Sequence, residues 1–136
     1  MTAQEYKDAG FDISTNLSQA KIDAAEDICR QAYITPITKG VEDESTADVV
    51  NKLLMSSAFL YLLRSRVFAT RSGAKIKMTA QSENIAEWQT VSQMCTTCAL
   101  YIDELRAAAA NVDGMNCDAK IYDVNKIYFK SNYFGL

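Results

Sequence analysis

The chain has 136 residues, of which 49% are hydrophobic and 23% charged, a composition that indicates a globular protein and excludes a disordered or fibrous one. A chain of this length forms one domain, which buries roughly two-thirds of the surface that its unfolded form exposes. The net charge of −3 argues against sequence-specific binding of nucleic acid by a single copy.

No targeting segment is predicted. The first ten residues are polar and acidic, where a secretory leader would be basic and then apolar. The longest apolar run, Leu53–Leu63, contains Ser56 and Ser57 and is shorter than the ~20 residues that span a bilayer. We therefore expect a protein that is neither exported nor inserted in a membrane.

A first helix is predicted over residues 17–34. Asn16 and Ser18 are good N-cap residues. The apolar residues that follow recur at helical spacing: Ile22, Ala25, Cys29 and Ala32. The residue before a proline is disfavoured in a helix, so Pro36 predicts that this helix ends by Thr35.

A second helix is predicted over residues 46–69. Ser45 and Asp48 form the serine-x-x-acid pattern of a helix start. The apolar residues lie on more than one side, which indicates burial by several neighbours: Val49, Val50, Leu53, Leu54, Phe59, Leu60, Leu63 and Val67.

A short strand is predicted over residues 74–78, because Ala74, Ile76 and Met78 alternate with polar residues. A single strand leaves its backbone donors and acceptors unpaired, so it needs a partner. Two partners remain open, the stretch 120–130 of this chain and a neighbouring molecule.

The third helix, over residues 83–111, is the most regular element and follows a polar turn at 79–84. Its apolar residues recur at intervals of three and four: Trp88, Val91, Cys95, Cys98, Ile102 and Leu105. Four alanines extend it, and Gly114 predicts its end.

Residues 119–136 are predicted to form an extended tail, since their aromatic residues have no helical period. The tail either folds back over its own helices or docks on a neighbour by strand addition or aromatic anchors. The residues expected at a subunit interface come from the strand and the tail: Ile76, Met78, Tyr122, Ile127, Tyr128, Phe129, Tyr133 and Phe134.

The charge is unevenly spread, because residues 49–82 hold six bases and no acid. Two interpretations of this basic cluster are open. In the first, its arginines lie at the negative end of a helix, where cations are favoured, and its lysines lie on the solvent-exposed face of a strand. In the second, the cluster contacts phosphates without sequence specificity. Its members are Arg64, Arg66, Arg71, Lys75 and Lys77.

The sequence offers little for catalysis or metal binding. It has no histidine, and its carboxylates occur in runs typical of solvated surfaces. Cys95-x-x-Cys98, with Cys29 and Cys117, suggests a four-thiolate zinc site, but zinc pairs usually lie on turns and this pair lies in a helical apolar stripe. We expect core thiols, with no catalytic residue, cofactor or metal.

The order of elements resembles the head-to-tail connector (adaptor, or neck) proteins of tailed bacteriophages. The similarity covers residues 46–110: a helix ending in Thr70-Arg71-Ser72-Gly73, a short strand, a polar turn and a long helix from Ser82 to Arg106. It implies a ring, typically of twelve copies, that lies beneath the portal and passes DNA through its centre. It also implies no enzymatic activity, no cofactor, and a tail that contacts neighbours or the portal.

The sequence therefore predicts a mostly α protein, a bundle of three or more helices with a short β element and an extended C-terminal tail. Residues 1–118 would form the connector-like domain and residues 119–136 the tail. The expected function is a ring adaptor of the virion neck, made in the host cytoplasm, which binds itself, the portal, further neck or tail proteins and, through the basic cluster, DNA. The alternatives are a cytosolic helical binding module acting as a monomer or dimer, and a small enzyme or metal protein using carboxylates and thiols.

Overall fold

The computed structural model describes residues 1–13, 16–72, 78–121 and 123–125, and it describes side chains in these ranges except between residues 66 and 88. This part of the protein is mostly helical, its helices pack together, and none of its residues lies in a strand. The mostly α class is thereby confirmed. The elements in chain order are α1 (Ala3–Asp8), α2 (Gln19–Cys29), the π-helix η1 (Arg30–Ile34), α3 (Thr35–Thr38), α4 (Glu44–Ser72) and α5 (Met78–Ala109).

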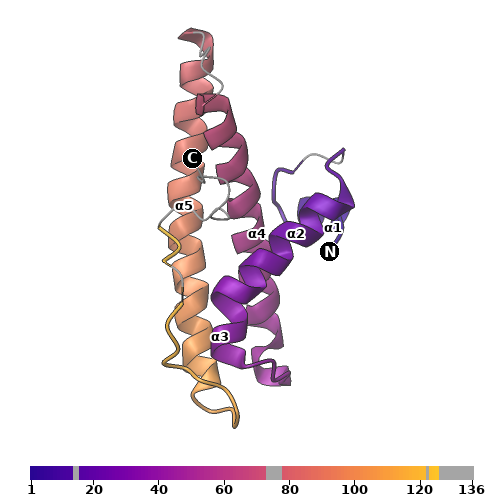
Figure 1. Ribbon diagram of the computed structural model, residues 1–136, viewed down its shortest axis with the longest axis vertical. Helices are drawn as coiled ribbons and strands as arrows, with labels where there is room; N and C mark the ends of the chain where they lie inside the picture. Colours follow the sequence, from indigo (N-terminus) through magenta and orange to yellow (C-terminus); the bar gives the residue numbers. More distant parts are fainter. Residues whose placement is uncertain (14–15, 73–77, 122, 126–136) are drawn as a thin grey trace.

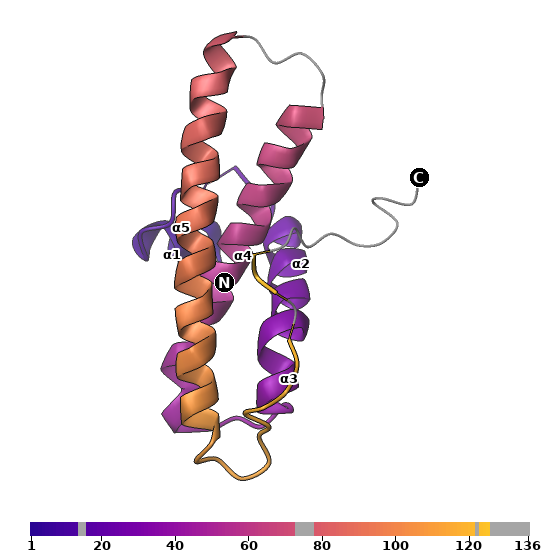
Figure 2. The same cartoon turned by 90° about the vertical axis from the view of Figure 1, so that its left-hand side faces the viewer.

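Helices α4 and α5 form a long antiparallel hairpin that spans the whole molecule (Figures 1 and 2). With 29 and 32 residues, they are about 44 and 48 Å long at 1.5 Å per residue. Helix α5 starts at Met78, so the turn predicted at 79–84 is wrong, and so is the last residue of the predicted strand. Residues 79–84 contain no Gly or Pro, so nothing in this stretch opposes a helix. The rest of the predicted strand lies outside the described residues.

The predicted first helix consists of α2 and the π-helix η1, and the helical path continues into α3, which contains the single proline. Ser18 is the N-cap of α2, as expected, and its side chain accepts a hydrogen bond from the Lys21 N–H. The helical path does not end by Thr35, which corrects the prediction. The Thr35 N–H donates to the carbonyl of Arg30, a π-helical bond, and Pro36 then occupies the first turn of α3, where its missing N–H costs nothing.

Helix α1 was not predicted from the sequence. Thr2 caps it by accepting a hydrogen bond from the Glu5 N–H, and Tyr6 is its buried residue. The tyrosine hydroxyl donates to a Glu26 carboxylate oxygen at 2.6 Å, which ties α1 to α2. The Thr2-x-x-Glu5 pattern is a capping-box signal that was available in the sequence.

The core lies where α2, η1 and α3 pack against the hairpin. The apolar stripes predicted for the first and third helices are buried at every described position, and most of the α4 set is buried too. On α4 the buried residues lie between Thr46 and Arg64, and on α5 between Val91 and Ala109. Beyond them, both helices continue past α1, α2 and α3, as Figures 1 and 2 show. We call residues 66–88 the projecting hairpin. Within the described residues, no helix combines the length and apolarity needed to cross a bilayer.

Candidate functional site

The structure removes Arg64 from the predicted basic cluster. Its side chain is 5% exposed and is used inside the protein, so it does not belong to a surface that meets DNA or a portal. Arg66 and Arg71 lie on α4, but their side chains are not among those that the structure describes. Lys75 and Lys77 lie wholly outside the described residues. These four residues are called the basic end of the hairpin below.

The residues predicted at a subunit interface also fall outside the described part, with one exception. Met78 is the first residue of α5, and its side chain is not described. The others keep the status of predictions: Ile76, Tyr122, Ile127, Tyr128, Phe129, Tyr133 and Phe134.

The described start of the C-terminal tail lies against the helices of its own chain. The sequence had left open whether the tail folds back in this way or docks on a neighbour. We call residues 116–125 the strap. The Asn116 N–H donates to the Ile37 carbonyl at 2.7 Å, which fixes its first residue beside α3. Two side-chain turns shape it: Asn116 Oδ1 accepts from the Asp118 N–H, and Asp123 Oδ1 accepts from the Asn125 N–H. Figure 2 shows the strap returning along the bundle from the end of α5.

Two arginines hold the strap by its backbone carbonyls. Arg106, in the last turn of α5, donates from Nη1 to the Cys117 carbonyl at 2.6 Å and from Nη2 to the Ala119 carbonyl at 2.8 Å. Arg64 of α4 donates from Nη2 to the Val124 carbonyl. Hydrogen bonds from a charged donor are the stronger kind, so both ends of the strap are firmly attached.

The Cys95 thiol completes the attachment at Val124. Its sulfur accepts from Arg64 Nη2 at 2.8 Å and its S–H donates to the Val124 carbonyl at 3.3 Å. Cys29 and Cys98 are buried in the same core, and burial raises the pKa of each of these thiols to about 12. All four cysteines are free, and among the described residues no three His, Cys, Asp or Glu side chains are placed to hold a metal ion.

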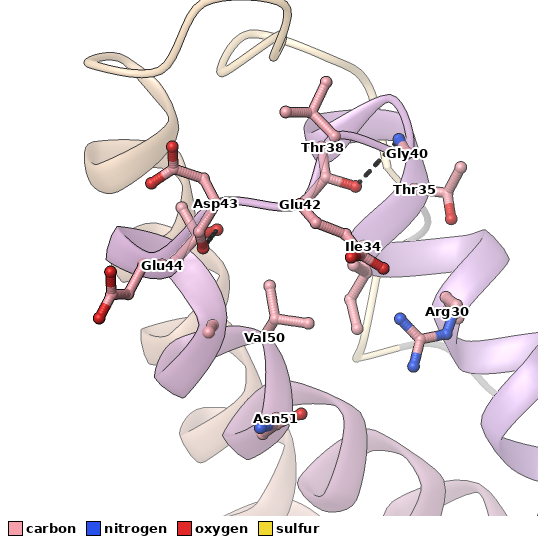
Figure 3. Close-up of a pocket in the computed structure, with 13 residues that line it drawn as sticks. Arg30, Ile34, Thr35, Thr38, Gly40, Glu42, Asp43, Glu44, Val50 and Asn51 are labelled. Carbon is pink, nitrogen blue, oxygen red and sulfur yellow. Dashed lines mark hydrogen bonds between the residues drawn. The ribbon is translucent and has the colours of Figure 1, made fainter.

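A large cleft lies at the end of the bundle where α4 begins. It has a volume of about 720 Å³ and is walled by η1, α3, residues 40–43 and the first two turns of α4. Figure 3 shows Asp43 and Glu44 on one side, Arg30 on another, and Val50 between them. We call it the acidic cleft, because Glu42, Asp43 and Glu44 outnumber Arg30.

The local structure of the acidic cleft follows from its sequence. Asp43 stabilises the start of α4 by accepting from the Ser45 N–H at 2.9 Å, and this holds the acidic run at a helix N-terminus, where negative charge is favoured. Lys39 and Gly40 have positive φ and turn the chain from α3 into this run. The Gly40 N–H donates to Thr38 Oγ1, shown as a dashed line in Figure 3. From the sequence, this stretch was expected to be only a solvated acidic loop. Arg30 and Val50 belong to other elements, and only the fold brings them to the same cleft.

A second, apolar cleft lies between the N-terminal segment and α4. Its volume is about 390 Å³, and apolar side chains make up most of its lining, with Asp12 and Lys21 also present: Ile13, Leu17, Phe59, Leu62 and Leu63. It can accept an apolar side chain, and its two charged residues offer one charge of each sign.

Comparisons with known proteins add no relative. The chain matches no protein-family model, and neither the curated proteins nor the solved structures contain a significant match to it. Function therefore has to be argued from the residues and the fold alone.

Proposed function

We propose that this chain is a structural adaptor that assembles with copies of itself into a ring in the neck of a tailed phage, between the portal and the tail, with DNA passing through the ring. Of the elements that carry the resemblance, the two long helices α4 and α5 support this function, whereas α5 begins at Met78 and leaves no polar turn at 79–84. The projecting hairpin is the observation that carries it.

Two antiparallel helices bury only the faces that they turn toward each other. The projecting hairpin continues beyond the helices that cover the rest of α4 and α5 (Figures 1 and 2), and its sequence still contains Val67, Phe68, Ile85 and Trp88. We expect a stretch with such a sequence, at a part of the hairpin that no other described helix covers, to need a covering partner. Neighbouring copies in a ring supply that partner at every position.

The strap supports the same function from the other end of the chain. It attaches residues as far as Val124 to the bundle, so the aromatic residues that follow start from a fixed point. We expect Tyr128, Phe129, Tyr133 and Phe134 to act as anchors on a neighbouring copy or on the portal. The basic end of the hairpin, without Arg64, is then available to an anionic surface, and DNA in the channel is one such surface.

The experiment is to shorten the projecting hairpin while keeping the core. Residues 67–87 are replaced by a four-residue Gly-Ser linker, which leaves every described buried residue in place. We expect the variant to remain helical by circular dichroism and to have the mass of a single chain by light scattering, whereas the unaltered chain forms rings visible by negative-stain microscopy. A folded variant that still forms the same rings would refute the role of the hairpin.

The second candidate function is a helical binding module that acts as a monomer or dimer. The apolar cleft favours it, because its five apolar residues offer a site for one side chain of a partner. Leu62→Ser makes the wall of this cleft more polar at a half-buried residue, so under this function it weakens partner binding while the circular dichroism spectrum and the mass of the free protein stay unchanged. Under the adaptor function the same change leaves ring formation intact.

A further inference from the structure

The two ends of the bundle carry opposite charge. Helix α4 begins at the acidic cleft and ends at the basic end of the hairpin, so about 44 Å of helix separates them. Residues 40–48 contain four acids and no base, whereas residues 65–82 contain four bases and no acid. A single copy is too rigid along α4 to bring the two ends together.

The acidic cleft has the chemistry that a long basic side chain needs. Its apolar lining includes Ile34, Val41 and Val50, and the hydroxyls of Thr35 and Thr38 also line it. Lysine and arginine bury their methylene stems on apolar surface and keep the charged group at polar acceptors. Figure 3 shows such acceptors, the carboxylates of Asp43 and Glu44, to one side of Val50.

We propose that the acidic cleft binds the basic end of the hairpin of a second copy of this chain. Arg66, Arg71, Lys75 and Lys77 supply the cations, and Glu42 and Glu44 are the carboxylates that receive them. This contact rests on the proposed self-assembly, to which it adds the two surfaces that meet. Charge complementarity of this kind fixes the register of an interface and suppresses wrong partners.

The position of the two surfaces determines the kind of assembly. Each copy contributes a different surface to the contact, so the interface is heterologous, and such interfaces generate closed rings when the rotation between copies closes. DNA does not fit the acidic cleft, because carboxylates repel phosphates. DNA is instead a rival ligand for the same four basic residues. An experiment on these residues alone therefore does not distinguish binding to the acidic cleft from binding to DNA.

Paired charge reversals separate them. The cleft variant is Glu42→Lys with Glu44→Lys, and the hairpin variant is Arg71→Glu with Lys75→Glu. Both cleft residues are exposed, and neither is the Asp43 that caps α4. The control matched to the cleft variant, Asp8→Lys with Asp23→Lys, makes the same change in net charge as that variant at two exposed acids of α1 and α2. Circular dichroism confirms that each variant is folded.

Self-association is measured by sedimentation velocity at low salt without DNA. We expect each variant alone to associate about tenfold or more weakly than the unaltered chain, because like charges then face each other. An equimolar mixture of the two variants restores association, since lysines in one cleft meet glutamates on the other hairpin. The control associates as the unaltered chain does.

The outcomes distinguish this contact from the proposed function. If the unaltered chain and the cleft variant form the same rings with equal affinity, the contact is refuted and self-assembly stands. Failure of the mixture to associate, with both variants folded, also refutes the contact. If the unaltered chain does not associate at all, both this contact and the proposed function are refuted.

Discussion

At the scale of single residues, Arg64 is the clearest example of a side chain whose role depends on distant parts of the chain. Its guanidinium donates to Cys95, 31 positions away, and to the Val124 carbonyl, 60 positions away. The sequence around it shows an arginine near the end of a helix, which is normally an exposed position. Its burial becomes apparent only when the strap lies across α4 and α5.

Replacing Arg64 by methionine keeps most of the side-chain length and removes the donors to Val124. A hydrogen bond from a charged group contributes about 1.5–3 kcal/mol, so we expect the strap to open about 10- to 100-fold more often. Lys120 is exposed on the strap, and trypsin cleavage after it, followed by mass spectrometry, reports this opening. Arg30→Met is the control, because Arg30 is an exposed residue of η1 and is not one of the two arginines that hold the strap. Equal cleavage rates in the two variants would contradict the assigned role of Arg64.

The buried thiols make stability depend on alkaline pH. Burial raises the pKa of Cys29 and Cys98 from 9.0 to about 12. Below pH 9 these thiols are protonated in both folded and unfolded chains, so their contribution is fully present; between pH 9 and 12 only the unfolded chain loses the protons, and stability falls. Each thiol lowers the unfolding free energy by up to about 1.4 kcal/mol per pH unit there. Burial and Glu26 raise the pKa of Tyr6, which adds a fall of the same sign above pH 10.

Urea unfolding at pH 8, 9.5 and 11 measures this dependence. We expect the unfolding free energy of the unaltered chain to decrease across the series and that of a Cys29→Ala, Cys98→Ala variant to decrease less. The variant lacks two of the groups that titrate differently in the folded and unfolded states. Identical slopes for the two proteins would show that these thiols are not protected by the fold.

Much of the burial pattern was predictable from the sequence at this scale. Spacings of three and four identified Ile22, Ala25 and Cys29 on α2 and Cys95 and Cys98 on α5, because a helix places such residues on one face. The same rule placed the cysteines in the core. It has no means of finding a buried charge, since Arg64 and its partners are far apart in the chain.

At the scale of elements, the existence of α2, α4 and α5 was predictable, whereas α1 was missed and most helix ends were not predicted. The stretch around Pro36 shows why: the proline removes a backbone donor, but the π-helical bond from Thr35 to Arg30 lets the chain continue as α3. At residues 79–84, polar side chains suggested a turn, yet the backbone there has no reason to leave the helix. The acidic cleft was missed for the same reason, because η1, α3 and α4 form it only after these ends are placed.

Gly114 controls how the loop after α5 packs on the loop after α3. Its φ is +89°, and a Cβ at this position would lie 3.2 Å from Val41 Cγ2. Gly10 has a similar φ of +96° with no atom within 4 Å of such a Cβ. We expect Gly10→Ala to cost about 1–2 kcal/mol of stability through its backbone alone, and Gly114→Ala to cost more.

Urea unfolding checks this order, and Val41→Ala removes the contact that distinguishes the two glycines. In the Val41→Ala background, Gly114→Ala should cost about as much as Gly10→Ala. If Gly114→Ala costs no more than Gly10→Ala in the unaltered background, the close packing of these two loops is not important for stability.

At the scale of the whole molecule, the lengths of the helices divide the protein into a core and a projection. Helices α1, α2 and α3 cover only part of the hairpin, and the start of α4 and the projecting hairpin lie at its opposite ends (Figure 1). The acidic cleft lies at the start of α4. A heterologous contact between these ends lets one copy extend an assembly begun by another. The sequence suggested a need for companions through its apolar content and its lone predicted strand. The basic residues were identified from the sequence, whereas the acidic cleft became identifiable only from the fold.

The most direct measurement of self-assembly is the molar mass of the full chain in solution, determined by light scattering over a range of concentrations at low salt. The account predicts a mass that reaches a fixed multiple of the single chain as concentration rises, and that decreases when salt screens the contact between the acidic cleft and the basic end of the hairpin. A mass equal to one chain at every concentration, with a folded helical spectrum, would contradict it.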